Sequence, residues 1–98
     1  MSTICIIGAF DTKAAEHAFV RDAILARGHR VFTINVGTLG TTALFPVDVE
    51  ANEIAAAGGS DLQALRQAHD RGDAMRVMST GAPVVVAQLY AEGKFDGI

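Results

Sequence analysis

An unbroken apolar run near the amino terminus constrains the fold of this chain more than any other stretch. Residues 4–7 read Ile-Cys-Ile-Ile, and Gly8 ends the run. A strand without alternating polar residues is typical of a parallel sheet that is covered on both faces. We therefore expect a strand over 3–8, followed by a helix over about 12–27. The apolar row that predicts this helix consists of Ala15, Phe19, Ala23 and Ala26.

A second run rich in β-branched and aromatic residues follows the expected helix. Gly28 is placed to end the helix in a left-handed conformation, and residues 31–36, Val-Phe-Thr-Ile-Asn-Val, run up to Gly37. Parallel crossovers are almost always right-handed, so both strand ends should open on one edge of the sheet. The pattern predicts an α/β fold of Rossmann-like, three-layer type with parallel strands. Ligands of such sheets bind beyond the carboxyl ends of the strands.

The middle of the chain predicts a loop and then short helices. Residues 38–47 contain too much Gly, Thr and Pro for a regular element. Asp48 is expected to cap a helix over 49–57, and Gly58-Gly59 should end it. Ser60 and Gln63 have the spacing of a capping box for the next helix, whose inner face would include Leu62, Leu65 and Ala68.

Two features of the last third leave alternatives open. We expect Gly72 either to interrupt the helical pattern or only to weaken it. Pro83 should either bend the helix or begin a new segment after Gly81. Residues 94–98 look like the opening of a third strand. We therefore expect residues 1–98 to be the amino-terminal part of a longer α/β domain, with an open sheet edge that favours a homo-oligomer or pairing with a missing carboxyl-terminal part.

Composition excludes several classes of function. A net charge of −3 without a cluster of Lys and Arg argues against nucleic acid as a partner. No signal peptide or membrane-spanning stretch is evident, so no membrane contact and a cytoplasmic location are expected. Cys5 is expected in the core, and Met75 and Met78 at helical spacing are expected there too. The three histidines lack the spacing of a helical zinc site, and no nucleophile elbow is present.

The turn after the first strand is the first candidate site. A helix amino terminus offers free N–H donors and partial positive charge, which suit a phosphate or carboxylate. Gly8 would allow close backbone approach, Thr12 would donate a hydroxyl, Lys13 would supply a point charge, and Asp11 would cap the helix or bind a phosphate-bound Mg²⁺. Equally, Asp11 or Thr12 is an ordinary cap and Lys13 is solvated near Glu16. No standard P-loop or dinucleotide fingerprint is present.

The loop after the second strand is the second candidate site. Gly37, Thr38 and Gly40 bring small residues and a hydroxyl to the same edge, where they can wrap a ribose or phosphate. A flexible loop has the same composition. Asn35 either reaches the crevice or satisfies backbone groups at the strand end.

Several short motifs, taken in order, resemble the amino-terminal part of the tomato mosaic virus resistance protein-like ATP-binding family. They are Gly8–Lys13, Ile34–Thr38, Ala68–Gly72, Leu89–Gly93 and Phe95–Ile98. The resemblance implies an incomplete first lobe of a two-lobe protein. It also implies ATP and Mg²⁺ near the first turn, with Gly8, Asp11, Thr12, Lys13 and Gly37 matching family positions, and a further glycine-rich loop beyond Ile98. Asn35, where the family often has Asp, and Pro83 depart from the pattern.

Three classes of function follow from these expectations. The first is a nucleotide-binding domain that holds phosphate at the turn after the first strand. The second is an oligomerisation or interaction module without a ligand. The third is one part of an ATP-consuming, small-molecule enzyme. The sequence does not decide whether the chain takes part in catalysis.

Overall fold

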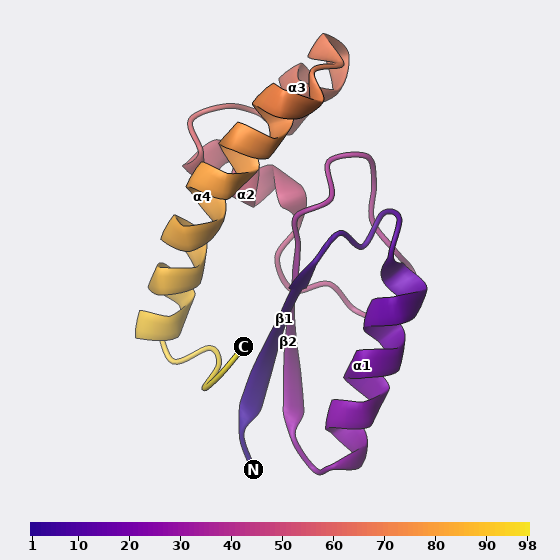
Figure 1. Ribbon diagram of the computed structural model, residues 1–98. Helices are drawn as coiled ribbons and strands as arrows, with labels where there is room; N and C mark the ends of the chain where they lie inside the picture. Colours follow the sequence, from indigo (N-terminus) through magenta and orange to yellow (C-terminus); the bar gives the residue numbers. More distant parts are fainter.

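The computed structural model describes residues 1–98 as two parallel strands and four helices (Figure 1). The elements are β1 (Thr3–Gly8), α1 (Ala14–Ala26), β2 (Arg30–Asn35), α2 (Ala51–Ala57), α3 (Leu62–Ala68) and α4 (Arg71–Ala91). Thr3 lies opposite Arg30 and Gly8 lies opposite Asn35. Gly28 has a φ of +84°, in the left-handed region that glycine adopts at helix ends. The predicted parallel unit is confirmed, with the helix starting at Ala14 rather than at Thr12.

The last residues of the chain run beside the other edge of β1. The Cys5 N–H donates to the Gly97 carbonyl at 2.7 Å, and the Asp96 N–H donates to the Thr3 carbonyl at 2.7 Å. Ile4 and Gly97 form a parallel bridge. The expected third-strand opening over 94–98 is therefore present as one bridge, and β1 lies between two parallel neighbours.

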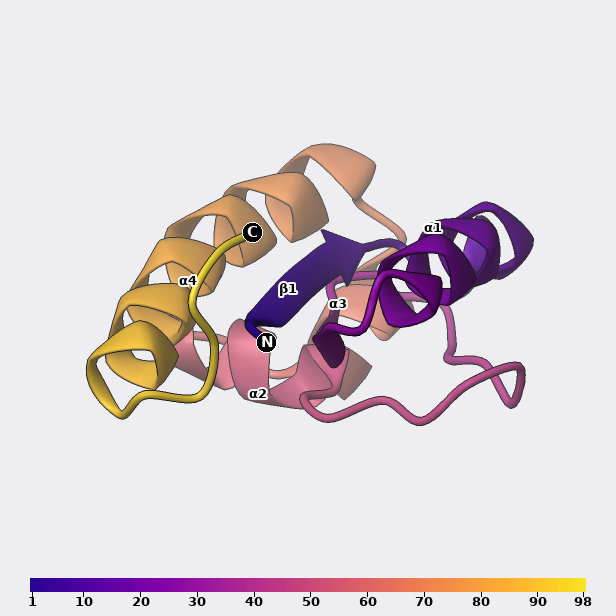
Figure 2. The ribbon, with the colours of Figure 1, turned by 90° about the horizontal axis from the view of Figure 1, so that it is seen from below.

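The sheet has helices on both faces, as Figures 1 and 2 show: α1 covers one face, and α2 and α4 lie on the other. Side chains alternate along β1 accordingly. Ile6 packs with Phe10 and Phe45 on the α1 side, whereas Cys5 packs with Ile34 and residues of α2 and α4 on the opposite side. The predicted three-layer α/β arrangement is confirmed. No helix combines the length and the apolar composition that crossing a bilayer requires.

Helix α1 turns its most regular apolar row toward solvent. Ala15, Phe19, Ala23 and Ala26 are all exposed, and 77% of Phe19 is accessible. The apolar side chains of α1 that pack toward the sheet include Ala18 and Ile24, and both are only half-buried. The row that predicts the helix from sequence is thus not the row that contacts the sheet.

The caps of α2 and α3 differ from the expected ones. α2 begins at Ala51 rather than at 49, and Glu50 precedes it without a side-chain cap. The Asp48 carboxylate instead accepts from the Thr33 N–H at 2.8 Å, which fixes it beside β2. For α3, Asp61 accepts from the Ala64 N–H at 3.0 Å, so Asp61 and not Ser60 is the cap. A carboxylate one residue later reaches the same class of free amide, which is why the capping box predicted at Ser60 is wrong.

Helix α4 is a single element through Pro83, so a new segment after Gly81 is wrong. Gly72 lies in its first turn and does not interrupt it. The helical pattern breaks instead at His69, whose φ is +52°, and at Asp70, which caps α4. Gly81 is buried against α2, where a Cβ would lie 2.0 Å from the Ile54 carbonyl oxygen. Only glycine allows this close crossing of α2 and α4.

Candidate functional site at the carboxyl edge of the sheet

A cleft of about 820 Å³ opens where β1 and β2 end. Ile7, Ala9 and Val36 contribute the strand ends, and the start of α4 with the end of α3 forms the opposite wall. Four of the predicted site residues line it together: Asp11, Thr12, Gly37 and Thr38. Both candidate loops therefore meet at one cleft, in the place where parallel sheets bind ligands.

Asp11 joins the two loops. Its Oδ1 accepts from the Thr12 N–H at 2.8 Å, and its Oδ2 accepts from the Leu39 N–H at 3.0 Å. A Cβ on Gly37 would lie 2.4 Å from the Asp11 Cγ, whereas a Cβ on Gly40 would lie 3.8 Å from the Asp11 Cβ. Gly37 thus leaves room for the carboxylate, and the loop after β2 folds around Asp11.

Asn35 is fully buried below the same loops and uses its full hydrogen-bonding capacity. Its Oδ1 accepts from the Phe10 N–H at 3.1 Å and from the Gly37 N–H at 2.8 Å. Its Nδ2 donates to the Gly40 carbonyl at 2.9 Å and to Glu50 Oε1 at 3.0 Å. Of the two alternatives for Asn35, the structure supports satisfaction of backbone groups. One side chain thereby fixes the ends of both strands.

Three of the predicted site residues, Gly8, Lys13 and Gly40, do not line the cleft. Lys13 is the exposed residue before α1, and its N–H donates to the Ala9 carbonyl at 3.0 Å. The expectation that Asp11 or Thr12 caps α1 is wrong, because Lys13 holds that position without a side-chain bond. A Cβ on Gly8 would lie 2.0 Å from His17 Nε2, so packing of the imidazole accounts for this glycine.

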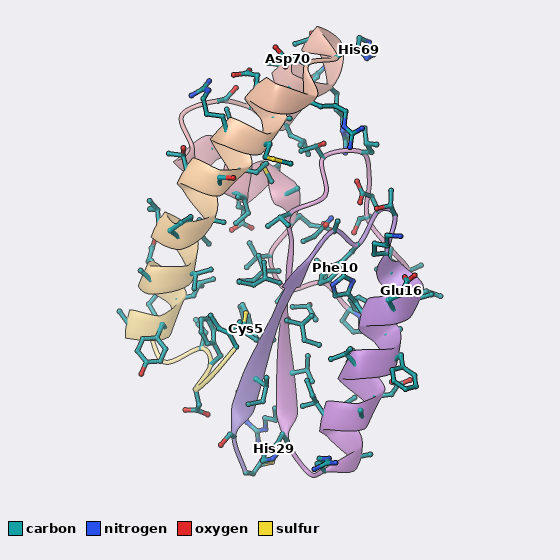
Figure 3. The ribbon with its side chains drawn as sticks, in the orientation of Figure 1. Cys5, Phe10, Glu16, His29, His69 and Asp70 are labelled. Atoms are coloured by element: carbon teal, nitrogen blue, oxygen red, sulfur yellow. The ribbon has the colours of Figure 1, made fainter.

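The opposite wall carries two cations that the sequence interpretation missed. Arg66 and Arg71 line the cleft, and neither forms an ion pair with a carboxylate of the chain. The Arg66 Nε donates to the Thr38 carbonyl, which connects α3 to the loop after β2. Asp70 is already bonded to the Asp73 N–H at 3.0 Å. Figure 3 places His69 and Asp70 at the junction of α3 and α4, where the wall turns.

A signal for this wall exists in the sequence. In a parallel unit, the helix that follows a strand begins near the carboxyl edge of the sheet, so cations at its start lie near the ligand. Arg71 begins α4, the helix that leads back to β1. A helix break at His69 places Arg66 just before it and Arg71 just after it, and so predicts both arginines near the site.

The rim of the cleft is apolar. Leu39 is 75% exposed and Met75 is 68% exposed, and both line the opening. Met78 is buried in the core as expected, whereas the expectation of a core position for Met75 is wrong. No group of three or more His, Cys, Asp or Glu side chains is placed to hold a metal ion.

These features define an α/β domain with parallel strands and a cleft at their carboxyl ends. The chain belongs to UPF0261, because the model of the "Uncharacterised protein family (UPF0261) N-terminal domain" matches residues 2–98. It is 38% identical over 95 residues to a UPF0261 protein of Clostridium tetani, a match that covers 97% of this chain and 23% of the relative.

Two further relatives carry the same family name. A UPF0261 protein of Mesorhizobium japonicum is 41% identical over 78 residues, covering 80% of this chain and 19% of the relative. A UPF0261 protein of Brucella suis is 34% identical over 95 residues, covering 97% of this chain and 22% of the relative. The chain thus spans about a fifth of the length of these relatives. No solved structure matches the chain.

These matches correct the resemblance drawn from short motifs. The family model and the relatives place the chain in UPF0261, so assignment to the tomato mosaic virus resistance protein-like family is wrong. The physical reason lies in the motifs themselves. Gly8 and Gly37 leave room for His17 and Asp11, and Asp11 holds two amides. Residues that a tight turn requires do not distinguish one family from another.

Proposed function

We propose that this domain binds a nucleotide in the cleft, with its phosphates between the two loops and the arginine wall. The observation that carries the proposal is the pair Arg66 and Arg71, which line the cleft without carboxylate partners. A guanidinium group presents planar, paired donors that match phosphate oxygens. Asp11 and Asp70 also line the cleft, but neither is paired with these arginines, so both guanidinium groups are free to bind an anionic ligand.

The size and the lining of the cleft support a ligand with both polar and apolar parts. Its volume of about 820 Å³ lies within the range of roughly 300–1,000 Å³ for small-molecule sites. Leu39 and Met75 at the rim, with Leu65 and Met78 behind them, give apolar surface for a flat ring. Thr12 and Thr38 add polar groups close to the strand ends. This distribution suits a base at the rim and phosphates near the sheet.

ATP with Mg²⁺ is the specific ligand pair that we propose. Mg²⁺ sites commonly use one or two carboxylates together with phosphate oxygens and waters. Each oxygen of Asp11 accepts one amide hydrogen bond and retains a lone pair, so this carboxylate can also bind a hydrated cation. The ion would neutralise phosphate charge next to Asp11. Thr12, Gly37 and Thr38 would then contact the ligand, and Gly40 would support the second loop from outside the cleft. Lys13 and Gly8 would act only if the ligand extends over the start of α1.

Titration calorimetry with ATP and MgCl₂ tests the proposal. We expect saturable binding that weakens by about tenfold for each of Arg66→Ala and Arg71→Ala, the equivalent of about 1.4 kcal/mol. Arg30→Ala is the matched control, because Arg30 is exposed at the amino end of β2, away from the cleft. Lys13→Ala reports separately on the turn after β1. Absence of saturable binding, or equal loss in the Arg30 control, would overturn the proposal.

A further inference from the structure

The exposed row of α1 is the most regular unpartnered apolar surface of the molecule. Phe19 stands between Ala15 and Ala23 on this row, and Val20 beside it is 47% exposed. We call Ala15, Phe19, Ala23 and Ala26 the α1 stripe. A large side chain between small ones, four residues apart, forms a knob next to two hollows on a helix surface. Such a surface can pack against a copy of itself.

Charged residues beside the stripe have a matching arrangement. Glu16 at the start of α1 and Arg27 just after its end lie on the same flank of the stripe, because their positions on the helix differ by only about 20° at 100° per residue. Both side chains are exposed, and neither forms a hydrogen bond or an ion pair within the chain. Figure 3 shows Glu16 on the outer side of α1.

We propose that α1 packs antiparallel against α1 of a second copy of this chain, about a two-fold axis. In an antiparallel pair the same flanks of the two helices meet, so Glu16 of each copy faces Arg27 of the other. Because of the two-fold symmetry, the dimer contains two equivalent Glu16–Arg27 ion pairs. In a parallel pair the opposite flanks of the two helices meet instead, so Glu16 would not face Arg27 and both ion pairs would be lost.

The register set by these charges also fits the stripe. Placing Glu16 beside the partner's Arg27 centres the contact between Arg21 and Asp22. Phe19 of each copy then lies within about one residue, or roughly 1.5 Å along the axis, of the small side chain at position 23 of the other. On the opposite flank, Asp22 lies near the axis. Arg21 is 3.9 Å from the Asp22 carboxylate and supplies a countercharge there.

This surface is separate from the nucleotide proposal. α1 covers one face of the sheet, and α3 and α4, which form the wall of the cleft, lie on the other side (Figure 1). Dimerisation through α1 would leave the cleft open in both copies. Binding in the cleft and association through α1 can therefore fail independently.

Sedimentation equilibrium over a series of protein concentrations tests the proposal. We expect a monomer–dimer equilibrium for the unmodified chain and a monomer for Phe19→Ser, with unchanged circular dichroism because Phe19 is exposed. Met75→Ser is the matched control: Met75 is 68% exposed but lines the cleft, so this variant should dimerise normally. An unmodified chain that stays monomeric throughout the series would overturn the proposal.

Charge reversal tests the orientation of the two helices. Glu16→Arg and Arg27→Glu should each weaken the dimer by about fivefold, as expected for a pair of exposed ion pairs. The double variant exchanges the charges and should restore the affinity in an antiparallel dimer. The loss of dimer affinity in each single variant should be smaller at high salt. Failure of the double variant to recover, with its fold intact, would rule out this pairing.

Discussion

The carboxylate of Asp11 occupies the space into which a side chain on Gly37 would point. The distance from a Cβ on Gly37 to the Asp11 Cγ would be 2.4 Å, well below normal contact. The carboxylate cannot rotate away without giving up the Thr12 and Leu39 amides. The two residues are therefore a matched pair across the ends of adjacent strands.

Gly37→Ala should lower the free energy of unfolding by about 1–3 kcal/mol, because the added methyl group displaces a bonded carboxylate. Gly40→Ala is the control. Its Cβ would lie 3.8 Å from the Asp11 Cβ, so this substitution should change the free energy of unfolding little. Urea denaturation measures both. In a double-mutant cycle, Asp11→Ala should relieve part of the cost of Gly37→Ala, and strict additivity would contradict the pairing.

Gly81→Ala should destabilise the domain by about 3 kcal/mol. A methyl group at this position would lie 2.0 Å from the Ile54 carbonyl oxygen, so the backbones of α2 and α4 must separate, and this outweighs the gain of about 1 kcal/mol in helix propensity. Gly72→Ala in the first turn of the same helix meets nothing closer than 3.4 Å and should be neutral or stabilising. Thermal denaturation compares the two, and a similar melting temperature for both would contradict the close crossing.

Asn35→Ala should cost about 3 kcal/mol, because it leaves the buried amides of Phe10 and Gly37, and the half-buried partners at Gly40 and Glu50, without their bonds. Asn52→Ala in α2 removes an exposed amide and should change stability by less than about 0.5 kcal/mol. Chemical denaturation gives both values. Amide hydrogen exchange should also quicken at Phe10 and Gly37 in the Asn35 variant, and unchanged protection there would count against its role.

Cys5 should resist alkylation in the folded protein. Burial, assisted by the negative charge of Asp48, raises the pKa of its thiol from 9.0 to about 11. The folded state therefore keeps its proton while the unfolded state loses it, and stability should fall as the pH rises from about 9 through 11. A thiol reagent at pH 8 should react only as fast as the chain unfolds.

The Cys5→Ala variant provides the control for this pH dependence. Its stability should lack the decline between pH 9 and 11 that the thiol contributes. Rapid alkylation of native Cys5 at pH 8 would show that the thiol is accessible, contrary to its 2% exposure.

Strand positions and their parallel pairing could be predicted because a strand that is buried on both faces has a continuous run of apolar residues. β1 coincides with the predicted range, β2 lies within one residue of it, and Gly28 adopts the predicted left-handed conformation. The edge at which the two loops meet followed from the handedness of the crossover. These features depend on local composition and on a general rule of chain topology.

The remaining features depend on contacts between distant residues. Alanine on several sides of α1 makes its sequence consistent with more than one buried face, so its orientation was not predictable from periodicity. Asp48 and Asp61 are both carboxylates before short helices, yet one pairs with Thr33 and the other caps. Arg66 and Arg71 were missed because the break between α3 and α4 occurs at His69, where no glycine marks the left-handed position.

The two sides of the cleft differ in how many hydrogen bonds hold them in place. On the strand-end side, Asn35 is bonded to the buried amides of Phe10 and Gly37 and to the half-buried carbonyl of Gly40. The helical side reaches the loops through Arg66, from an exposed position. Altered ligand preference in proteins of this architecture should therefore arise by exchanging side chains on α3 and the first turns of α4, with the loop framework left as it stands.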